Sequence, residues 1–192
     1  MILEHVILFF AWIFYYLLHS VFASNQIKSW TGLKPKTYRL LYSLIATVLL
    51  FIVLLYGATI YSVLLYAPNN TSTYTGLMLS AVGIFIIKRS FRKYSFREFV
   101  GLKKEENTHL VVDGIQKHIR HPLYTGTLMI FVGYFVFNPQ ASNLIMLFSL
   151  IIYLPFGIKS EERKLIEHFG EAYIGYKEST PALFPKFRGK YK

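Results

Sequence analysis

Long apolar stretches alternate with short polar connections along this chain. Three of these stretches, residues 2–24, 40–61 and 74–87, are long enough to cross a membrane, or nearly so. A spanning helix needs about 20 predominantly apolar residues, and the third stretch reaches that length only with the residues that flank it. The pattern therefore predicts three membrane helices within residues 1–87.

Two shorter apolar stretches follow, at residues 123–137 and 144–158. As helices they would each reach about 22 Å, less than the roughly 30 Å of a bilayer's hydrocarbon core. The connection between them contains Asn138 and Pro139, which are typical of a turn. This helical pair, residues 123–158, either crosses the membrane as two short spans or enters and leaves on one side as a hairpin.

Two segments are too polar for a membrane interior. Residues 89–120 are rich in charge. Residues 159–176 are expected to form a helix on the membrane surface, because five of them are spaced by three or four positions and so share one face. That face comprises Glu162, Ile166, Phe169, Tyr173 and Tyr176. Gly170 either interrupts this helix or ends it. The tail from Pro181 to Pro185 is expected to lie extended across another element.

Together these elements predict an all-α polytopic membrane protein with three transmembrane helices and a C-terminal helical pair. We expect a single membrane domain over residues 1–192, with about five membrane helices. The distribution of charge predicts its orientation. All 21 Lys and Arg residues fall at 28–39, 88–120 and 159–192, whereas the connections at 67–74 and 138–143 are uncharged. Cationic loops stay cytoplasmic, so the N-terminus is expected outside and the C-terminus in the cytoplasm.

Composition narrows the possible partners. The chain is 54% apolar and carries a net charge of +11, but its charges flank the apolar stretches and form no separate basic domain. Membrane lipids with anionic headgroups are therefore the expected partners, and nucleic acid is not. The chain has no cysteine, which excludes disulfides, thiolate metal sites and a cysteine nucleophile. Its six histidines show no spacing typical of a metal site.

The strongest candidate for chemistry is the start of the first helix of the pair. Pro122 suits the first turn of a helix, where a missing N–H does no harm. Arg120 and His121 come just before that helix start, whose free N–H groups favour an anion. These residues could bind a carboxylate in a cofactor or substrate. From composition alone, a basic collar that contacts lipid phosphates is the favoured reading.

Acidic and ionisable residues at the membrane edge are the next candidates. Glu161 and Glu162 follow the last apolar stretch, and Glu162 is expected to point inward, where an Arg or a cationic ligand would compensate it. A solvated helix start is the alternative. His19 lies inside the first apolar stretch and is either functional or a neutral histidine hydrogen-bonded between helices.

Several separate motifs in the C-terminal half share their order and spacing with one family. They are His109-Leu110-Val111, Gly114-Ile115, Arg120-His121-Pro122 with Tyr124 and Gly126, Glu161-Glu162, Phe169-Gly170 with Tyr173 and Tyr176, and Pro185. From His109 onward the chain resembles the isoprenylcysteine carboxyl methyltransferase family of small integral membrane methyltransferases. One departure is Gln116, where the family often has Tyr. The N-terminal half does not decide the subfamily. His19-Ser20 with Lys28, and Ser95–Leu102, look more like a bacterial branch that includes thiol S-methyltransferases, so we expect a bacterial inner membrane.

The resemblance implies S-adenosyl-L-methionine as the cofactor and a methyltransferase core over residues 88–192, with a cytoplasmic cofactor pocket. The residues implied to line that pocket are His109, Leu110, Val111, Gly114, Arg120, His121, Pro122, Tyr124, Glu161 and Glu162. A carboxylate acceptor would need a cation to orient it, and Arg120 or Arg163 could serve. A thiol or amine acceptor must lose a proton, for which Glu162 or His121 are candidates.

The expected function is methyl transfer to a lipophilic or small thiol, carboxylate or amine acceptor. Two other classes of function stay open. The chain could be a non-catalytic membrane protein that keeps the fold to bind lipid or a partner. It could also be a reductase with a nicotinamide cofactor, related to the sterol reductases, although its C-terminal half is short for that class.

Overall fold

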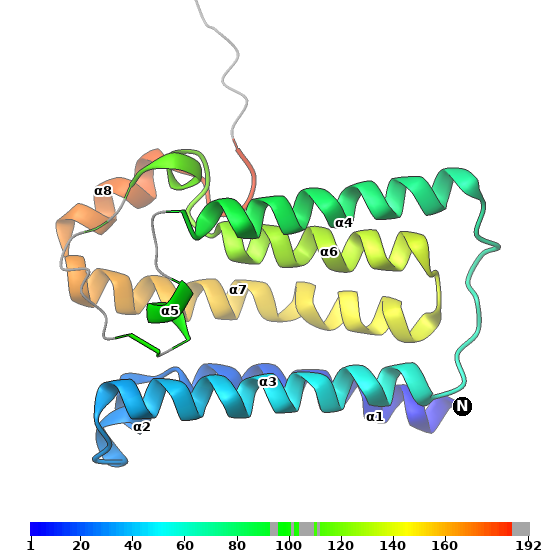
Figure 1. Cartoon of the computed structure of the whole chain (residues 1–192), viewed down its shortest axis with the longest axis horizontal. Coiled ribbons are helices and arrows are strands. Elements are labelled where there is room, and N and C mark those ends of the chain that lie inside the picture. Colours follow the sequence, from blue (N-terminus) through cyan, green and yellow to red (C-terminus); the bar gives the residue numbers. More distant parts are fainter. Residues whose placement is uncertain (93–95, 101, 104–109, 111, 186–192) are drawn as a thin grey trace, which may run out of the picture.

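The computed structural model describes the chain except for residues 93–95, 101, 104–109, 111 and 186–192. The described residues form a helical bundle, which confirms the predicted all-α class (Figure 1). The helices in chain order are α1 (Ile2–Phe22), α2 (Asn25–Trp30), α3 (Pro35–Thr59), α4 (Asn70–Ser90), α5 (Phe96–Phe99), the 3-10 helix η1 (Gly114–Lys117), α6 (Pro122–Phe137), α7 (Ala141–Phe169) and α8 (Glu171–Ser179).

Within the described residues, four helices are long and apolar enough to cross a membrane. They are α1, α3, α4 and α7, and α6 is a shorter apolar helix. As predicted, α4 reaches spanning length by including flanking polar residues at its start. Asn69 caps that start, because its side chain accepts from the Ser72 N–H at 2.9 Å. The sequence placed the start of the second span at residue 40, whereas α3 already begins at Pro35.

The structure corrects the predicted ends of the last membrane helix. The sequence reading ended it at residue 158 and began a separate surface helix at Lys159, but α7 runs without a break to Phe169. Its 29 residues span about 44 Å, so its charged C-terminal part extends beyond a hydrocarbon core of about 30 Å. The helix then ends at Gly170, which has φ +55° and separates α7 from α8. The acidic pair therefore lies on the same continuous helix as the apolar stretch.

Glycines bring α4 and α6 into close contact. Figure 1 shows the two helices side by side along their length. A Cβ atom built on Gly83 would lie 2.5 Å from the Gly126 carbonyl oxygen, and one on Gly76 would lie 2.6 Å from that of Gly133. The two glycines of each helix are seven residues apart, so they share one face. Small residues let membrane helices approach this closely, and the start of α6 is thereby fixed against α4.

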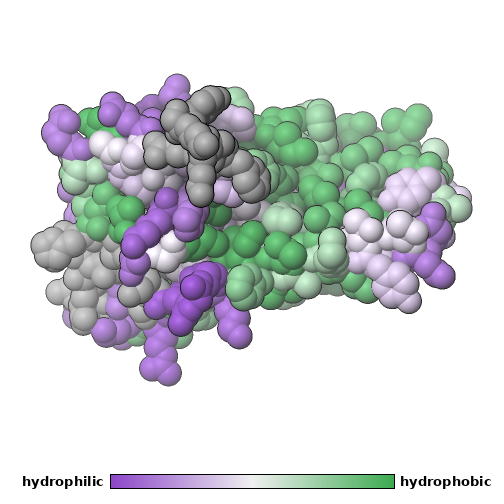
Figure 2. Space-filling view, turned by 90° about the horizontal axis from the view of Figure 1, so that it is seen from above, coloured by the Kyte–Doolittle hydropathy of each residue, from purple (hydrophilic) through white to green (hydrophobic). Residues whose placement is uncertain are grey.

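The second packing layer joins α1 to α7. Its buried core includes Trp12 and Tyr16 of α1 and Leu150 and Leu154 of α7. Most other large apolar side chains face outward, which suits a lipid environment. Figure 2 shows this apolar belt, with hydrophilic residues gathered mainly at the end of the bundle that carries α2 and α8 in Figure 1. An apolar belt and a polar end are both typical of an integral membrane protein.

Candidate functional site

The C-terminal segment lies across the start of α6. The Arg120 and His121 N–H groups donate to the carbonyl oxygens of Pro181 and Ala182, each at 2.9 Å. One turn into α6, the Thr125 hydroxyl donates to the carbonyl oxygen of Leu183 at 2.7 Å. These contacts confirm that the tail lies across another element, although the chain bends at residues 182–184 instead of staying extended. Pro122 stands in the first turn of α6, as predicted from its missing N–H.

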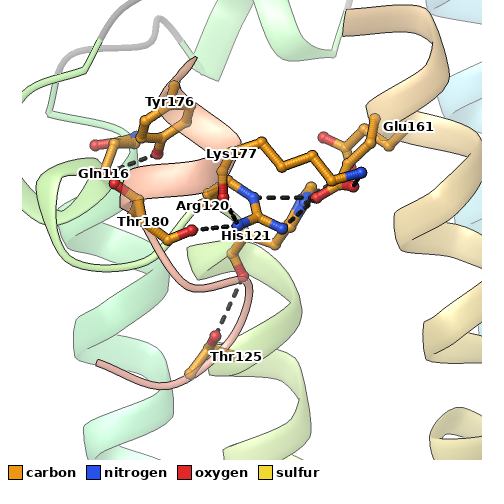
Figure 3. Close-up of polar contacts among 9 residues, drawn as sticks. Gln116, Arg120, His121, Thr125, Glu161, Tyr176, Lys177 and Thr180 are labelled. Atoms are coloured by element: carbon orange, nitrogen blue, oxygen red, sulfur yellow. Dashed lines mark hydrogen bonds and ion pairs between the residues drawn. The ribbon is translucent and has the colours of Figure 1, made fainter. Parts of the chain in front are cut away.

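A buried ion pair joins the start of α6 to the charged end of α7. The Arg120 Nη2 atom lies 2.6 Å from Glu162 Oε1, and Nε donates to the same oxygen at 3.0 Å (Figure 3). The side chains are only 9% and 6% exposed. The prediction that Glu162 points inward and is compensated by an arginine is thus confirmed. A buried carboxylate without such partners would be costly.

Two more side chains converge on the same carboxylate. Lys177 of α8 places its Nζ 2.7 Å from Glu162 Oε2, and His121 Nε2 lies 3.2 Å from Oε1. The other ring nitrogen of His121 lies 3.5 Å from Glu161 Oε2. The cluster Arg120, His121, Glu162 and Lys177 therefore connects α6, α7 and α8, and we call it the ionic cluster.

Arg120 uses most of its hydrogen-bonding capacity inside the protein. A guanidinium has five N–H donors. Two of them point at Glu162, and Nη1 donates to the carbonyl oxygens of Lys177 and Thr180. Arg120 consequently fixes the turn after α8 as well as α7. This geometry does not fit a basic collar on lipid phosphates, because the charge is neutralised internally.

Glu161 faces a different set of groups from its neighbour. Its side chain is 48% exposed, and its Oε2 atom lies 3.5 Å from His121 Nδ1. The Tyr124 ring lies 5.7 Å from the His121 ring and packs against the α1–α7 core. A half-exposed carboxylate beside two aromatic rings is a suitable environment for a cation.

The other predicted site residues do not belong to the ionic cluster, and two of them lie outside the described part of the chain. His109 and Val111 lie outside the described residues, and Leu110 is half-buried. Gly114 begins η1 with φ +60°, and Asp113 caps that helix through the Gly114 N–H. Arg163 is exposed on α7, and no contact described here joins it to the ionic cluster. Its role stays a prediction.

The structure shows several contacts and burials in this region that the sequence did not predict. Gln116 is buried, and its backbone carbonyl oxygen accepts a hydrogen bond from the Tyr176 hydroxyl at 2.6 Å. Gln116 therefore anchors α8. Lys177 lies one helical turn after Tyr173, a spacing that could have placed it on the buried face. The Tyr173 hydroxyl is buried and has no hydrogen-bond partner among the described residues. Burial, and then the Glu162 carboxylate, raise the pKa of that hydroxyl.

His19 of α1 lies within hydrogen-bonding distance of α3. Its ring nitrogens are 3.0 Å from the Tyr42 hydroxyl. This arrangement agrees with a histidine that links two membrane helices, the second of the two readings that the sequence left open.

Comparison with known proteins shows that this chain is similar to methyltransferases. The chain is 27% identical over 187 residues to a methanethiol S-methyltransferase of Pseudomonas deceptionensis, covering 88% of this chain and 68% of that protein. A protein of the same name from Crocosphaera subtropica is 28% identical over 183 residues, covering 90% of this chain and 71% of the relative. The helical fold and the ionic cluster thus belong to a chain whose relatives include methyltransferases.

A third relative matches a shorter part of the chain. The protein-S-isoprenylcysteine O-methyltransferase of Schizosaccharomyces pombe is 32% identical over 99 residues, covering 47% of this chain and 39% of that protein. The chain therefore spans well under half the length of this relative. A sequence model of the NnrU protein family matches residues 7–184. The chain belongs to the NnrU protein family, and the predicted resemblance to the isoprenylcysteine carboxyl methyltransferases is confirmed.

Proposed function

We propose that this chain is an S-adenosylmethionine-dependent methyltransferase that works at the cytoplasmic face of a bacterial inner membrane. The observation that carries the proposal is the ionic cluster. It brings together the Arg120-His121-Pro122 and Glu161-Glu162 motifs. His121 and Glu162, for example, are 41 residues apart in the sequence. The cluster holds the helix start, the charged end of α7 and the C-terminal tail together around Tyr124 and Glu161.

The residues present fit the chemistry of this cofactor. When bound, it supplies a methyl group on a positively charged sulfur, together with an ammonium and a carboxylate. The half-exposed Glu161 carboxylate and the rings of His121 and Tyr124 suit the positive groups. The buried, unpaired hydroxyl of Tyr173 is a donor that a bound polar group would satisfy.

We assign the cofactor site to the residues that the resemblance implies. They are His109, Leu110, Val111, Gly114, Arg120, His121, Pro122, Tyr124, Glu161 and Glu162. Arg120 and Glu162 act by holding the walls of the site, because each already binds the other. His121, Tyr124 and Glu161 are the side chains that would contact the cofactor.

The acceptor that we favour is a small neutral thiol. The two methanethiol S-methyltransferases described above match 88% and 90% of this chain, whereas the S. pombe protein-S-isoprenylcysteine O-methyltransferase matches 47% of it. A carboxylate acceptor would need a cation such as Arg163, which stands exposed on α7. The chain's own contribution is to hold the acceptor in line with the methyl group and to exclude water.

Cofactor binding tests this proposal directly. Calorimetry on the full chain in lipid nanodiscs is expected to show saturable binding of S-adenosylhomocysteine and none of NADPH. Replacing Tyr124 with Ala should weaken that binding, whereas the control variant Phe148→Ala, on the lipid-exposed side of α7, should not. Binding of NADPH instead would support a reductase. Binding of neither compound would support a non-catalytic protein, and either result would overturn the proposal.

A further inference from the structure

A hollow lies between the end of α4, the start of α6 and the C-terminal tail. Its volume is about 420 Å³, within the range of about 300–1,000 Å³ that is typical of ligand pockets. The apolar side chains that line it are Ile86, Ile115, Ile119, Met129, Phe184 and Pro185. We call this hollow the tail pocket. It brings together two residues of the sequence motifs, Ile115 and Pro185, to which the proposed cofactor site gives no role.

The lining of the tail pocket is apolar apart from two side chains. Thr125 is one of them, but its hydroxyl already donates to the Leu183 carbonyl oxygen at 2.7 Å. His118 is the other, and it is exposed. The pocket therefore offers a large contact surface to a hydrocarbon group and few hydrogen bonds to a polar one. A hydrocarbon chain suits it better than a sugar or a nucleotide.

Positive charge surrounds the tail pocket at the edge of the apolar belt. Ile86 belongs to α4, which is apolar enough to cross a membrane, and Lys88 and Arg89 stand in the last turn of that helix. Both cations are exposed and lie within one helical turn of Ile86. Lys117 of η1 is exposed too and pairs with Asp113 at 3.4 Å. Cations at such an edge attract the anionic headgroups of lipids.

The tail itself has two sides, and the pocket lies on one of them. Leu183 packs against the α1–α7 core, whereas Phe184 and Pro185 line the pocket. Phe184 is 58% exposed, although it is large and apolar. A hydrocarbon chain in the pocket would cover this ring. The tail, which already accepts hydrogen bonds at Pro181 and Ala182, would then be held on both sides.

We propose that the tail pocket binds one acyl chain of an anionic phospholipid, whose headgroup lies at Lys88 and Arg89. The site does not depend on the methyltransferase function proposed above. Each CH₂ group that leaves water for the apolar lining favours binding, and the two cations favour a negatively charged headgroup over a zwitterionic one. The lipid thus fastens the tail over the start of α6.

Lipid selectivity is the first test of the site. Native mass spectrometry of the full chain, released from detergent micelles, counts the phospholipids that the protein retains. The protein would be titrated with phosphatidylglycerol and, separately, with phosphatidylcholine that carries the same acyl chains. We expect phosphatidylglycerol to bind at least about five-fold more tightly, since each cation near the headgroup contributes about that factor. Equal affinity for the two lipids, or no retained lipid, would overturn the proposal.

Two isoleucines of α4 provide a matched pair of variants. Ile86→Trp fills the tail pocket, whereas Ile84→Trp places the same side chain at a position that is 58% exposed on the same helix. We expect Ile86→Trp to weaken phosphatidylglycerol binding by about 10-fold or more, which corresponds to about two CH₂ groups displaced from the pocket. Ile84→Trp should leave the affinity unchanged. Equal affinity in the two variants would place the lipid elsewhere and overturn the proposal.

Two further changes separate the chain from the headgroup. Phe184→Ala removes part of the pocket wall at an exposed position that contributes little to folding, and it should weaken the binding of both lipids. Replacing Lys88 and Arg89 together with Gln should remove the preference for phosphatidylglycerol and leave phosphatidylcholine binding unchanged. A preference that survives the double change would contradict the assigned headgroup position. Circular dichroism would check that each variant keeps its helices.

Discussion

Arg120 and Glu162, 42 residues apart in the sequence, form a buried ion pair with a nitrogen–oxygen distance of 2.6 Å. The pair fixes the start of α6 against the part of α7 that extends beyond the membrane. Arg120 also donates to two carbonyl groups at the end of α8, so one side chain organises three elements. Its removal is expected to affect folding and the site together.

The first prediction concerns this pair. Glu162→Ala leaves the cations Arg120 and Lys177 without their carboxylate, and Arg120→Ala leaves the carboxylate with fewer partners. Breaking a buried pair costs about 3–5 kcal/mol. Both variants should therefore lose that much stability in reversible denaturation in mixed micelles. The double variant should cost less than the sum of the two single ones.

Glu161→Gln serves as the control for stability, because its side chain is half-exposed and lies outside the buried pair. We expect it to cost less than about 1 kcal/mol. Additive effects of Arg120→Ala and Glu162→Ala would contradict the pairing.

A second prediction concerns the glycine contacts between α4 and α6. In Gly83→Ala the new methyl group would lie 2.5 Å from the Gly126 carbonyl oxygen, so the helices would have to separate. Overpacking of this kind costs about 1–3 kcal/mol. Thermal unfolding followed by circular dichroism should show the loss. In Gly57→Ala the new methyl group meets only a leucine side chain at 3.4 Å, so an equal loss there would contradict the contact.

The third prediction concerns the break between α7 and α8. Gly170 adopts φ +55° and ψ −133°, a conformation that other residues reach only with strain. Gly170→Ala is expected to cost about 1–3 kcal/mol and to weaken S-adenosylhomocysteine binding by displacing Lys177. Gly175 lies inside α8 with open space around it, so Gly175→Ala should be neutral or stabilising. Equal behaviour of the two variants in unfolding and calorimetry would refute this account.

A fourth prediction concerns orientation in the membrane. The chain contains no cysteine, so single cysteines introduced at exposed positions report on sidedness. We expect a membrane-impermeant maleimide added to intact cells to label Thr71→Cys but not Glu178→Cys. Inverted membrane vesicles should give the opposite labelling. Labelling of Glu178→Cys in intact cells would place the ionic cluster outside and contradict the assignment from the basic loops.

Much of the fold followed from composition along the chain. Runs of apolar residues predicted α1, α3 and α4, because hydrocarbon thickness sets the length of a spanning helix. The end of α7 was not predictable in this way. The change from apolar to charged residues at Lys159 marks where the helix leaves the membrane, and backbone hydrogen bonding continues across it to Phe169.

The candidate site was predictable in part. Arg120, His121 and Glu162 could be named because charged residues at a membrane edge need partners, and the structure joins them. The role of Lys177 depends on the break at Gly170, which redirects α8 toward α7. The pairing of Ser20 with Tyr153, 133 residues apart, depends on how α1 packs on α7, which no local pattern encodes.

Methyl transfer by the purified full chain tests the central claim most directly. The protein in nanodiscs would be incubated with methyl-labelled S-adenosylmethionine and, separately, with a small alkanethiol, a prenylated cysteine and a lipid amine. We predict labelled methyl thioether from the alkanethiol, formed together with an equal amount of S-adenosylhomocysteine. No labelled product from any acceptor, by a protein that is folded and saturated with each one, would contradict the account.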